Sequence, residues 1–332
     1  MVTRLRRNER GVAILAVLLG VALMTLIVVD FAMTSGLGFV SAANQANELR
    51  AGYLARSGIS VGLGLLAADA RSKEQSQTPA ETLNDLWAVP FPPMALEGGT
   101  VSLSIVDEAR KLPINSMVDQ YGTLNQAAIA KIQRLFTILD VNTDLIADII
   151  EWISAGGANA PGGGIAGFYL GLQPPYQPRY GPMPTIGDLQ MVKGFNEAIF
   201  NRVSPFLTVM PVQIFNPNNP ARMRASATSQ VNANTASPQV LAALEPELME
   251  DQKIVQEIIE ARAIRPFSQT TDIMNLPDVG PVGQRLSQDV VMRSQFFTIS
   301  GAGTYAGARE ITTATFHRET NGIGTLAAWH ED

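Results

Sequence analysis

The chain has 332 residues, a formal net charge of -6 and no cysteine. This length can bury a sizeable core and favours more than one domain. The segment up to Gly11 carries four arginines and one glutamate, a net +3, which leaves -9 for the rest of the chain. An acidic bulk argues against nucleic acid as the main partner, because phosphate binding depends on clustered Lys and Arg. The lack of cysteine excludes disulfides and thiolate chemistry, and the two histidines, His317 and His330, make most histidine-based sites unlikely on number alone.

The first long hydrophobic run extends from Val12 to Val29 and carries no charged residue. A run of this length can cross a bilayer. Arginines at positions 4, 6, 7 and 10 precede it, and basic residues favour the cytoplasmic side of a membrane. The pattern therefore predicts a single-pass transmembrane helix over residues 12–30, with the remaining chain on the opposite side.

Three interpretations compete for this N-terminal segment. A cleaved secretory signal would use Ser41-Ala42-Ala43 as its small-residue cleavage site, which lies far downstream of the apolar core. A plain signal anchor is the second interpretation. The third is a prepilin leader over residues 1–11, because Arg10-Gly11 is followed directly by the apolar helix, in a form that resembles the type IV prepilins. That resemblance implies cleavage by a prepilin peptidase between Gly11 and Val12, with methylation of Val12.

Beyond the apolar run, a helix-compatible pattern continues and predicts one N-terminal helix over residues 12–70. A polar, proline-bearing loop follows it. Residues 100–106 alternate apolar and polar side chains, which predicts a half-buried strand, and similar alternation predicts strands over 294–303, 310–318 and 326–329. We expect residues 71–113 and 290–332 to form one antiparallel sheet. Asp107 and Glu108, at the end of the first strand, are metal-ligand candidates, although a solvated strand end is the favoured interpretation.

Residues 114–289 contain an internal repeat. Each copy begins with asparagines that are suited to cap a helix, and two apolar helices and a short helix with a turn follow. The first copy starts at Asn115 and the second at Asn232, Asn234 and Thr235. The pattern predicts an inserted all-α domain built from duplicated helical units.

These features together resemble the K-type minor pseudopilins of the type II secretion system. The resemblance rests on the prepilin-like start, on Trp152 and on two segments, Asn234-Thr235-Ala236-Ser237-Pro238 and Pro266-Phe267-Ser268. It implies an α+β fold with a type IV pilin-like N-terminal helix and an antiparallel sheet. It also implies a non-enzymatic role at or near the tip of a pseudopilus, in pseudopilus assembly and in export across the outer membrane. The implied location is the inner membrane, with the C-terminal domain in the periplasm. The implied partners are the I- and J-type minor pseudopilins and the prepilin peptidase.

Ala16 occupies the fifth position after the expected cleavage, where pilins resemble one another in carrying a glutamate. The resemblance associates that glutamate with the N-terminal amine of the next subunit up the filament. A subunit without it is suited to the tip.

The resemblance also implies calcium near the segment that follows Trp152, although residues 155–186 contain no Asp or Glu. Calcium prefers six to eight oxygen ligands. The nearby acidic residues are the candidate ligands, and no other cofactor is expected: Asp140, Asp144, Asp148, Glu151 and Asp188. Gly162–Gly167 matches a dinucleotide-binding pattern, but the strand that this motif requires is missing before it.

A membrane-anchored helix-hairpin-helix DNA-binding protein is the alternative function. The turn Leu276-Pro277-Asp278-Val279-Gly280 resembles those modules, in which hairpin N–H groups and nearby basic residues hold phosphates. Only Arg285 and, in the first copy, Lys193 lie near the two turns, so nucleic acid is not expected as a partner. The sequence offers no nucleophile–base set and no phosphate loop, and so neither an enzyme nor a small-molecule substrate is expected.

Overall fold

The computed structural model describes residues 9–76, 80–119, 121–154, 166–210, 212–213, 224–225, 229–280, 282–318 and 324–331. The leader up to residue 8 and most of the glycine-rich motif lie outside them. The helices are α1 Glu9–Ser76, α2 Gln126–Ile138, α3 Leu145–Ile153, α4 Ala166–Leu170, α5 Glu197–Val203, α6 Pro238–Ala242, α7 Pro246–Glu250, α8 Gln252–Ile264, α9 Thr270–Met274 and α10 Gly283–Asp289. The strands are β1 Met94–Leu96, β2 Gly99–Asp107, β3 Leu112–Pro113, β4 Leu207–Thr208, β5 Val212–Gln213, β6 Arg224–Ala225, β7 Val231–Asn232, β8 Val290–Val291, β9 Phe296–Tyr305, β10 Ala308–Arg318 and β11 Gly324–Glu331.

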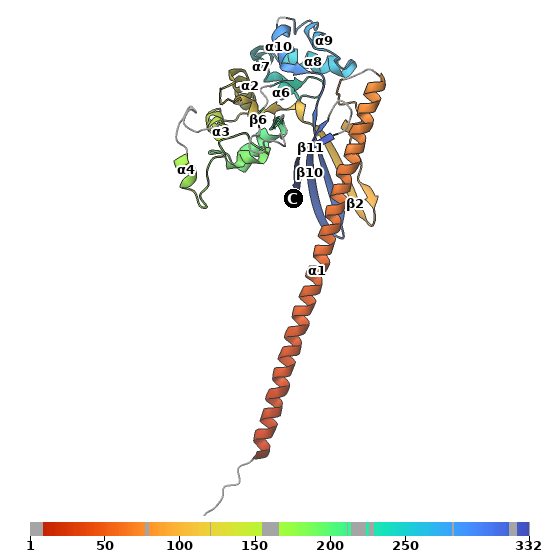
Figure 1. The fold of residues 1–332 in the computed structure, drawn as a ribbon, viewed down its shortest axis with the longest axis vertical. Helices are drawn as coiled ribbons and strands as arrows, with labels where there is room; N and C mark the ends of the chain where they lie inside the picture. Colours follow the sequence, from red (N-terminus) through yellow and green to blue (C-terminus); the bar gives the residue numbers. More distant parts are fainter. Residues whose placement is uncertain are drawn as a thin grey trace, which may run out of the picture.

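Helix α1 forms a stalk that projects far from the rest of the molecule (Figure 1). Its apolar half is exposed to solvent in the isolated chain, with Leu19 at 72% and Met24 at 71% exposure. It is long and apolar enough to cross a membrane. The helix continues to Ser76, whereas a loop was expected from residue 71. The polar residues there remain helical, because Arg71 Nε donates to the Ala67 carbonyl and Lys73 pairs with Asp69 one turn earlier.

The upper half of α1 lies along one face of a five-stranded antiparallel sheet with the order β1-β2-β9-β10-β11. The predicted strands are present. The sheet also contains β1, which the sequence analysis missed inside its loop. β1 joins β2 through the two residues Glu97 and Gly98, both with positive φ, at 50° and 79°. Such two-residue turns connect twisted antiparallel strands, and the glycine accepts this backbone without strain.

Small residues bring α1 into direct backbone contact with β9. A methyl group added at Gly301 would lie 2.2 Å from the Ala55 carbonyl oxygen, and one at Gly303 would lie 2.0 Å from that of Ala51. These glycines are therefore required by the close approach of the helix. Beside this seam, apolar side chains from α1 and the sheet form a compact core that includes Ile59, Leu66, Trp87, Leu103, Ile105, Phe297, Ile299, Ala314 and Phe316.

The segment between β3 and β8 is an insertion that stands beside and beyond the end of the sheet (Figure 1). Its core is separate from the core between α1 and the sheet. The described residues are mostly helical, but they also contain two-residue strands, so the expected all-α composition is not strictly correct. β3 pairs in parallel with β4, and β7 pairs in parallel with β8. Each pair joins the beginning of a copy of the repeat to its end.

Asn115 and Asn234 make equivalent contacts in the two copies. Asn115 Nδ2 donates to the Met183 carbonyl at 2.9 Å, and its Oδ1 accepts from the Met183 N–H at 2.8 Å. Asn234 makes the same two bonds, both at 2.9 Å, with the backbone of Phe267. We call these two contacts the asparagine clasps. Two residues after Met183 and after Phe267 stand Thr185 and Gln269, and each is the N-cap of a short helical segment.

The clasps correct the prediction that these asparagines cap helices. The residue that caps α2 is Asn125, which accepts from the Ala128 N–H, and the residue that caps α6 is Ser237, which accepts from the Val240 N–H. Asn115 and Asn234 are instead buried, with 2% and 3% exposure. A buried amide must satisfy both its donor and its acceptor, and a long-range backbone partner does so where a helix N-terminus would use the acceptor only.

Candidate functional site: the stalk helix and its buried junction

The expected processing positions lie at the free end of α1. Gly11, Val12 and Ala16 are all exposed and helical. A methyl group added at Gly11 would meet no atom within 4 Å. Glycine in a helix costs about 1 kcal/mol relative to alanine. Packing within the described chain therefore provides no reason for a glycine at this position.

The five candidate calcium ligands do not converge on one point. Asp140 is fully exposed and lies 3.9 Å from Arg202. Asp148 lies 3.8 Å from the Lys193 ammonium, and burial raises the pKa of its carboxyl group. Asp188 accepts a hydrogen bond from Thr185 at 2.9 Å, while Asp144 is exposed and Glu151 is buried. Among the described residues, no three of these five acids bring ligand oxygens within 4.8 Å of one another, so calcium binding by this set stays a prediction.

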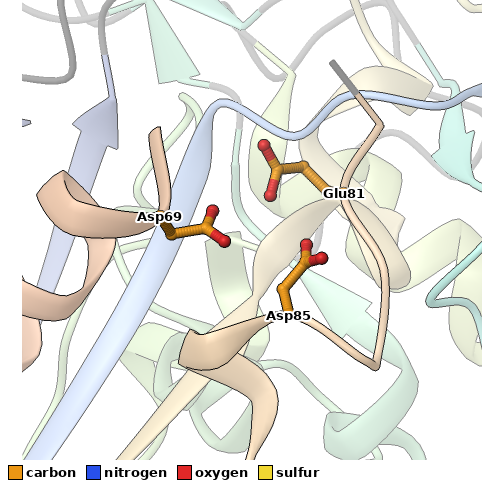
Figure 2. A group of neighbouring side chains, drawn as sticks. All are labelled: Asp69, Glu81 and Asp85. Carbon is orange, nitrogen blue, oxygen red and sulfur yellow. The ribbon is translucent and has the colours of Figure 1, made fainter. Parts of the chain in front are cut away.

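A different group of acids does converge, at the upper end of α1. Asp69 comes from α1, and Glu81 and Asp85 come from the segment that follows it, as Figure 2 shows. One oxygen from each of the three carboxylates lies within 4.8 Å of the others. Glu81 is 2% exposed and Asp69 is 6% exposed. Three carboxylates at this separation repel one another strongly unless positive charge lies between them.

Two basic side chains supply that charge. The Lys73 ammonium lies 2.9 Å from Asp69 Oδ2 and also pairs with Glu81 Oε2 and Asp85 Oδ2. Arg318, at the end of β10, lies 3.2 Å from Asp69 Oδ2 and pairs with Glu81 Oε1. We call these five residues the ionic cluster. Burial lowers the pKa of the Arg318 guanidinium, and the opposing effect of Asp69 is smaller.

Glu81 also joins this cluster to the inserted region through its backbone. Its N–H donates to the Met292 carbonyl at 2.7 Å, and its carbonyl accepts from Asn232 Nδ2 at 3.2 Å. Trp87 Nε1 donates to Glu81 at 3.2 Å and to Asp85 at 3.1 Å. One short segment therefore contacts the stalk, the sheet and the inserted region.

Asp107 forms a second connection between the sheet and the second copy of the repeat. Its Oδ2 accepts from Thr235 at 2.6 Å, from Ser294 at 2.7 Å and from Asn232 at 3.2 Å. Asp107 has no exposed surface, so the interpretation of a solvated strand end is wrong for this residue. Burial raises the pKa of its carboxyl group, although the hydrogen bonds it accepts act in the opposite direction.

The ionic cluster is not evident from the sequence alone. Its only local signal is the pair Asp69 and Lys73, spaced by four residues on a helix, and such pairs are common on solvated faces. The other members lie far along the chain, with 249 residues separating Asp69 from Arg318. Hydrophobic periodicity reports only on residues that are close together in the chain. It therefore cannot predict contacts between positions this far apart.

The hairpin-like turn of the second copy is not arranged for phosphate binding. In the second copy, the Asp278 N–H donates to the Glu257 carboxylate at 2.9 Å, so an acid occupies the side from which a phosphate would approach. Arg285 pairs with Glu245 at 3.2 Å and with Glu247. The electrostatics around this turn therefore disfavour DNA.

Comparisons with known proteins agree with this architecture. The family described as Type II secretion system (T2SS), protein K, matches residues 110–212 and residues 231–292, which correspond to the two copies of the repeat. Type II secretion system protein K of Pseudomonas aeruginosa is 25% identical over 327 residues, covering 96% of this chain and 91% of that protein. The Klebsiella pneumoniae protein of the same name is 23% identical, covering 82% and 81%.

A solved structure has the same fold. It is a chain of the GspK–GspI–GspJ complex from the type 2 secretion system of enterotoxigenic Escherichia coli. The TM-score is 0.71 at 14% identity, and the match covers 88% of this chain and 99% of that chain. Together with the duplicated unit and the apolar stalk, these matches show that the chain belongs to the type II secretion system protein K family.

Proposed function

We propose that this protein is a minor pseudopilin at or near the tip of a type II secretion pseudopilus. There it helps to start pseudopilus assembly and protein export across the outer membrane, as a structural subunit and not as an enzyme. The observation that carries the tip position is the bulk of the inserted region, which projects sideways at the end of α1 away from the apolar half (Figure 1). A regular shaft would have to accommodate this bulk at every repeat, whereas the tip leaves it free.

The stalk is proposed to anchor the protein in the inner membrane, with the sheet and the inserted region in the periplasm. The exposed apolar half of α1 supports a single pass. A prepilin peptidase is proposed to cut between Gly11 and Val12 and to methylate Val12. The lack of any packing role for Gly11 supports a requirement imposed by an enzyme.

The I- and J-type minor pseudopilins are the proposed partners. The fold shared with a chain of the GspK–GspI–GspJ complex supports this proposal. Ala16 is proposed to specify the tip, because it offers no carboxylate to the terminal amine of a subunit above it.

The proposal is tested by co-expressing the full-length protein with I- and J-type subunits and purifying it in detergent. We expect all three to be recovered together. A protein that elutes alone, while the I- and J-type subunits remain with each other, would contradict the assignment of partners.

Position in the filament is tested by immunogold labelling of pseudopili. We expect the wild-type protein at filament ends. Label of Ala16→Glu along the shaft would show that Ala16, and not the bulk of the inserted region, specifies the tip. Wild-type label distributed along the shaft would rule out the tip position.

Processing is tested by mass spectrometry of the protein isolated from membranes. The expected mature terminus is a methylated Val12. An intact Met1, or a terminus at residue 44, would rule out the prepilin leader. Substitution of Gly11 by valine should abolish cleavage.

A further inference from the structure

The ionic cluster has the geometry of a cation site that the chain fills with its own side chain. Calcium or magnesium would require carboxylate oxygens that converge on a point, and Asp69, Glu81 and Asp85 provide them within 4.8 Å of one another. The Lys73 ammonium occupies that position, because it pairs with one oxygen from each of the three. An ammonium has three N–H donors, one for each carboxylate.

The second cation completes the arrangement. Arg318 pairs with Glu81 Oε1 and with Asp69 Oδ2, whereas Lys73 pairs with Glu81 Oε2. The two oxygens of Glu81 are thus bound by different cations. The Arg318 guanidinium also lies over the Phe297 ring, 4.6 Å from its centroid. Stacking and planar donors hold a guanidinium in one orientation. Arg318 is therefore fixed by the sheet, whereas Lys73 is fixed by the helix.

Because the charged side chains of the ionic cluster are largely buried, their pairing constrains how the helix, loop and strand are oriented. The side chains of Lys73, Arg318 and Asp85 are 12%, 10% and 13% exposed. Removing one partner of a buried pair leaves an uncompensated charge, which costs far more than a surface pair contributes. Helix, loop and strand must therefore keep their relative positions for all five charges to remain paired.

The backbone of Glu81 carries that constraint into the second copy of the repeat, through Met292 and Asn232. We propose that Lys73 and Arg318 are built-in cations that replace a metal ion at Asp69, Glu81 and Asp85. The resulting clamp fixes the orientation of the inserted region on the end of the stalk. This inference does not depend on the proposed place of the protein in secretion.

Solvent has access to the clamp through a cleft of ≈ 520 Å³, which is lined in part by Asp69, Lys73 and Asp85. A cation from solution can therefore reach Asp69 and Asp85 through the cleft, and Glu81 behind them, once Lys73 no longer lies between the three carboxylates. The substitution Lys73→Met removes the ammonium and keeps an unbranched apolar side chain. It should convert a clamp that is independent of metal into one that requires a divalent cation.

The test uses the full-length protein in detergent with spin labels at Ser60→Cys on α1 and Lys253→Cys on α8, both exposed positions. The chain contains no other cysteine, so the labels are unique. Pulsed electron paramagnetic resonance then reports the distance between stalk and inserted region. The wild-type background should give one narrow distribution, identical in EDTA and in excess CaCl2. Lys73→Met should broaden it in EDTA and narrow it again in CaCl2.

Arg71→Met is the matched control, because Arg71 is exposed and its Nε donates to the Ala67 carbonyl of its own helix. It should leave the distribution unchanged in both conditions. If Lys73→Met does not fold, Lys73→Gln, which keeps N–H donors without charge, serves the same comparison. The proposal is overturned if EDTA broadens the wild-type distribution, since a metal ion would then be required. It is equally overturned if the neutral variant that folds stays narrow in EDTA.

Discussion

The two copies of the repeat share a skeleton but differ in what they hold. Both contain a parallel strand pair, an asparagine clasp and a short helical segment whose N-cap lies two residues beyond the residue that the asparagine binds. The first copy lies at the side of the molecule, whereas the second lies over the end of the stalk (Figure 1). The clasp therefore serves internal stability in both copies, and a separate set of contacts decides which copy anchors the insertion.

Two positions account for much of this difference. When the clasps are aligned, Asn232 of the second copy corresponds to Pro113, which has no side-chain donor. Thr235 corresponds to Ser116, whose hydroxyl donates to the Pro113 carbonyl within its own copy. In the second copy, Asn232 and Thr235 both donate to Asp107. Two side chains thus bond the second copy to Asp107 of the sheet, and the residues at the corresponding positions of the first copy make no such bond.

The largest loss of stability is expected for a substitution at Glu81, which connects the second copy to the stalk. Glu81→Ala leaves Lys73 and Arg318 short of negative charge in a buried site, which should cost about 3–5 kcal/mol of stability. Urea unfolding of the full-length protein in detergent measures it. Glu74→Ala, at an exposed position on the same stalk, is the control and should lie within about 0.5 kcal/mol of wild type. Equal behaviour of the two variants would show that the cluster does not anchor the insertion.

The clasps should be equivalent despite the different surroundings of the two copies. Asn115→Ala and Asn234→Ala each leave a buried backbone N–H and carbonyl without a partner, and we expect each to cost about 2–4 kcal/mol. Hydrogen exchange should accelerate at the Met183 amide in the first variant and at the Phe267 amide in the second. Asn201→Ala, at an exposed position on α5, should change neither. A large effect in one copy alone would contradict their equivalence.

The pH dependence of stability should separate the anchored copy from the other. Burial raises the folded-state pKa of Asp107 above its unfolded value of about 3.9. The protonated form is thus favoured in the folded state, so the stability it contributes is complete below the unfolded pKa and is lost as pH rises through the folded pKa. As pH rises, wild type should therefore lose stability relative to Asp107→Asn. The loss should be about 1.4 kcal/mol for each unit by which the folded-state pKa exceeds the unfolded-state pKa.

Urea titrations of both proteins from acid to neutral pH measure this shift. A difference that stays flat, or that moves in favour of wild type as pH rises, would show that the hydrogen bonds to Asp107 outweigh its burial.

The smallest expected effects are at the helix caps. Asn125→Ala on α2 and Ser237→Ala on α6 each remove one bond to a backbone N–H, which should cost about 1 kcal/mol. Glycine at the same positions should cost only a few tenths, roughly, because it tolerates the cap conformation. Thermal unfolding in parallel would compare them. A cost at Ser237 well above that at Asn125 would indicate that capping, too, differs between the copies.

Local patterns in the sequence predict the helices and strands. The ionic cluster and the asparagine clasps depend on long-range contacts, which such patterns do not predict. The apolar run predicted the stalk, and alternation predicted β2, β9 and β10, because each signal comes from residues close together in the chain. The protein K resemblance and the α+β fold class are also confirmed. The roles of Asn115 and Asn234 were assigned wrongly, because capping propensity cannot reveal a partner that lies 68 or 33 residues away. The ionic cluster was missed for the same reason, because its members are also far apart in the chain.

Gly301 and Gly303 of β9 also determine where along α1 the sheet packs. Gly301 and Gly303 lie against the backbone at Ala55 and Ala51, so sliding the helix by one turn would bring a larger side chain, Ile59 or Asn47, toward a surface with no room for it. The sheet can therefore dock at one level on the stalk. Some 20 residues of bare helix separate that level from the end of the apolar run, a spacing of about 30 Å. A lipid-embedded stalk would hold the inserted region at one fixed reach above the bilayer.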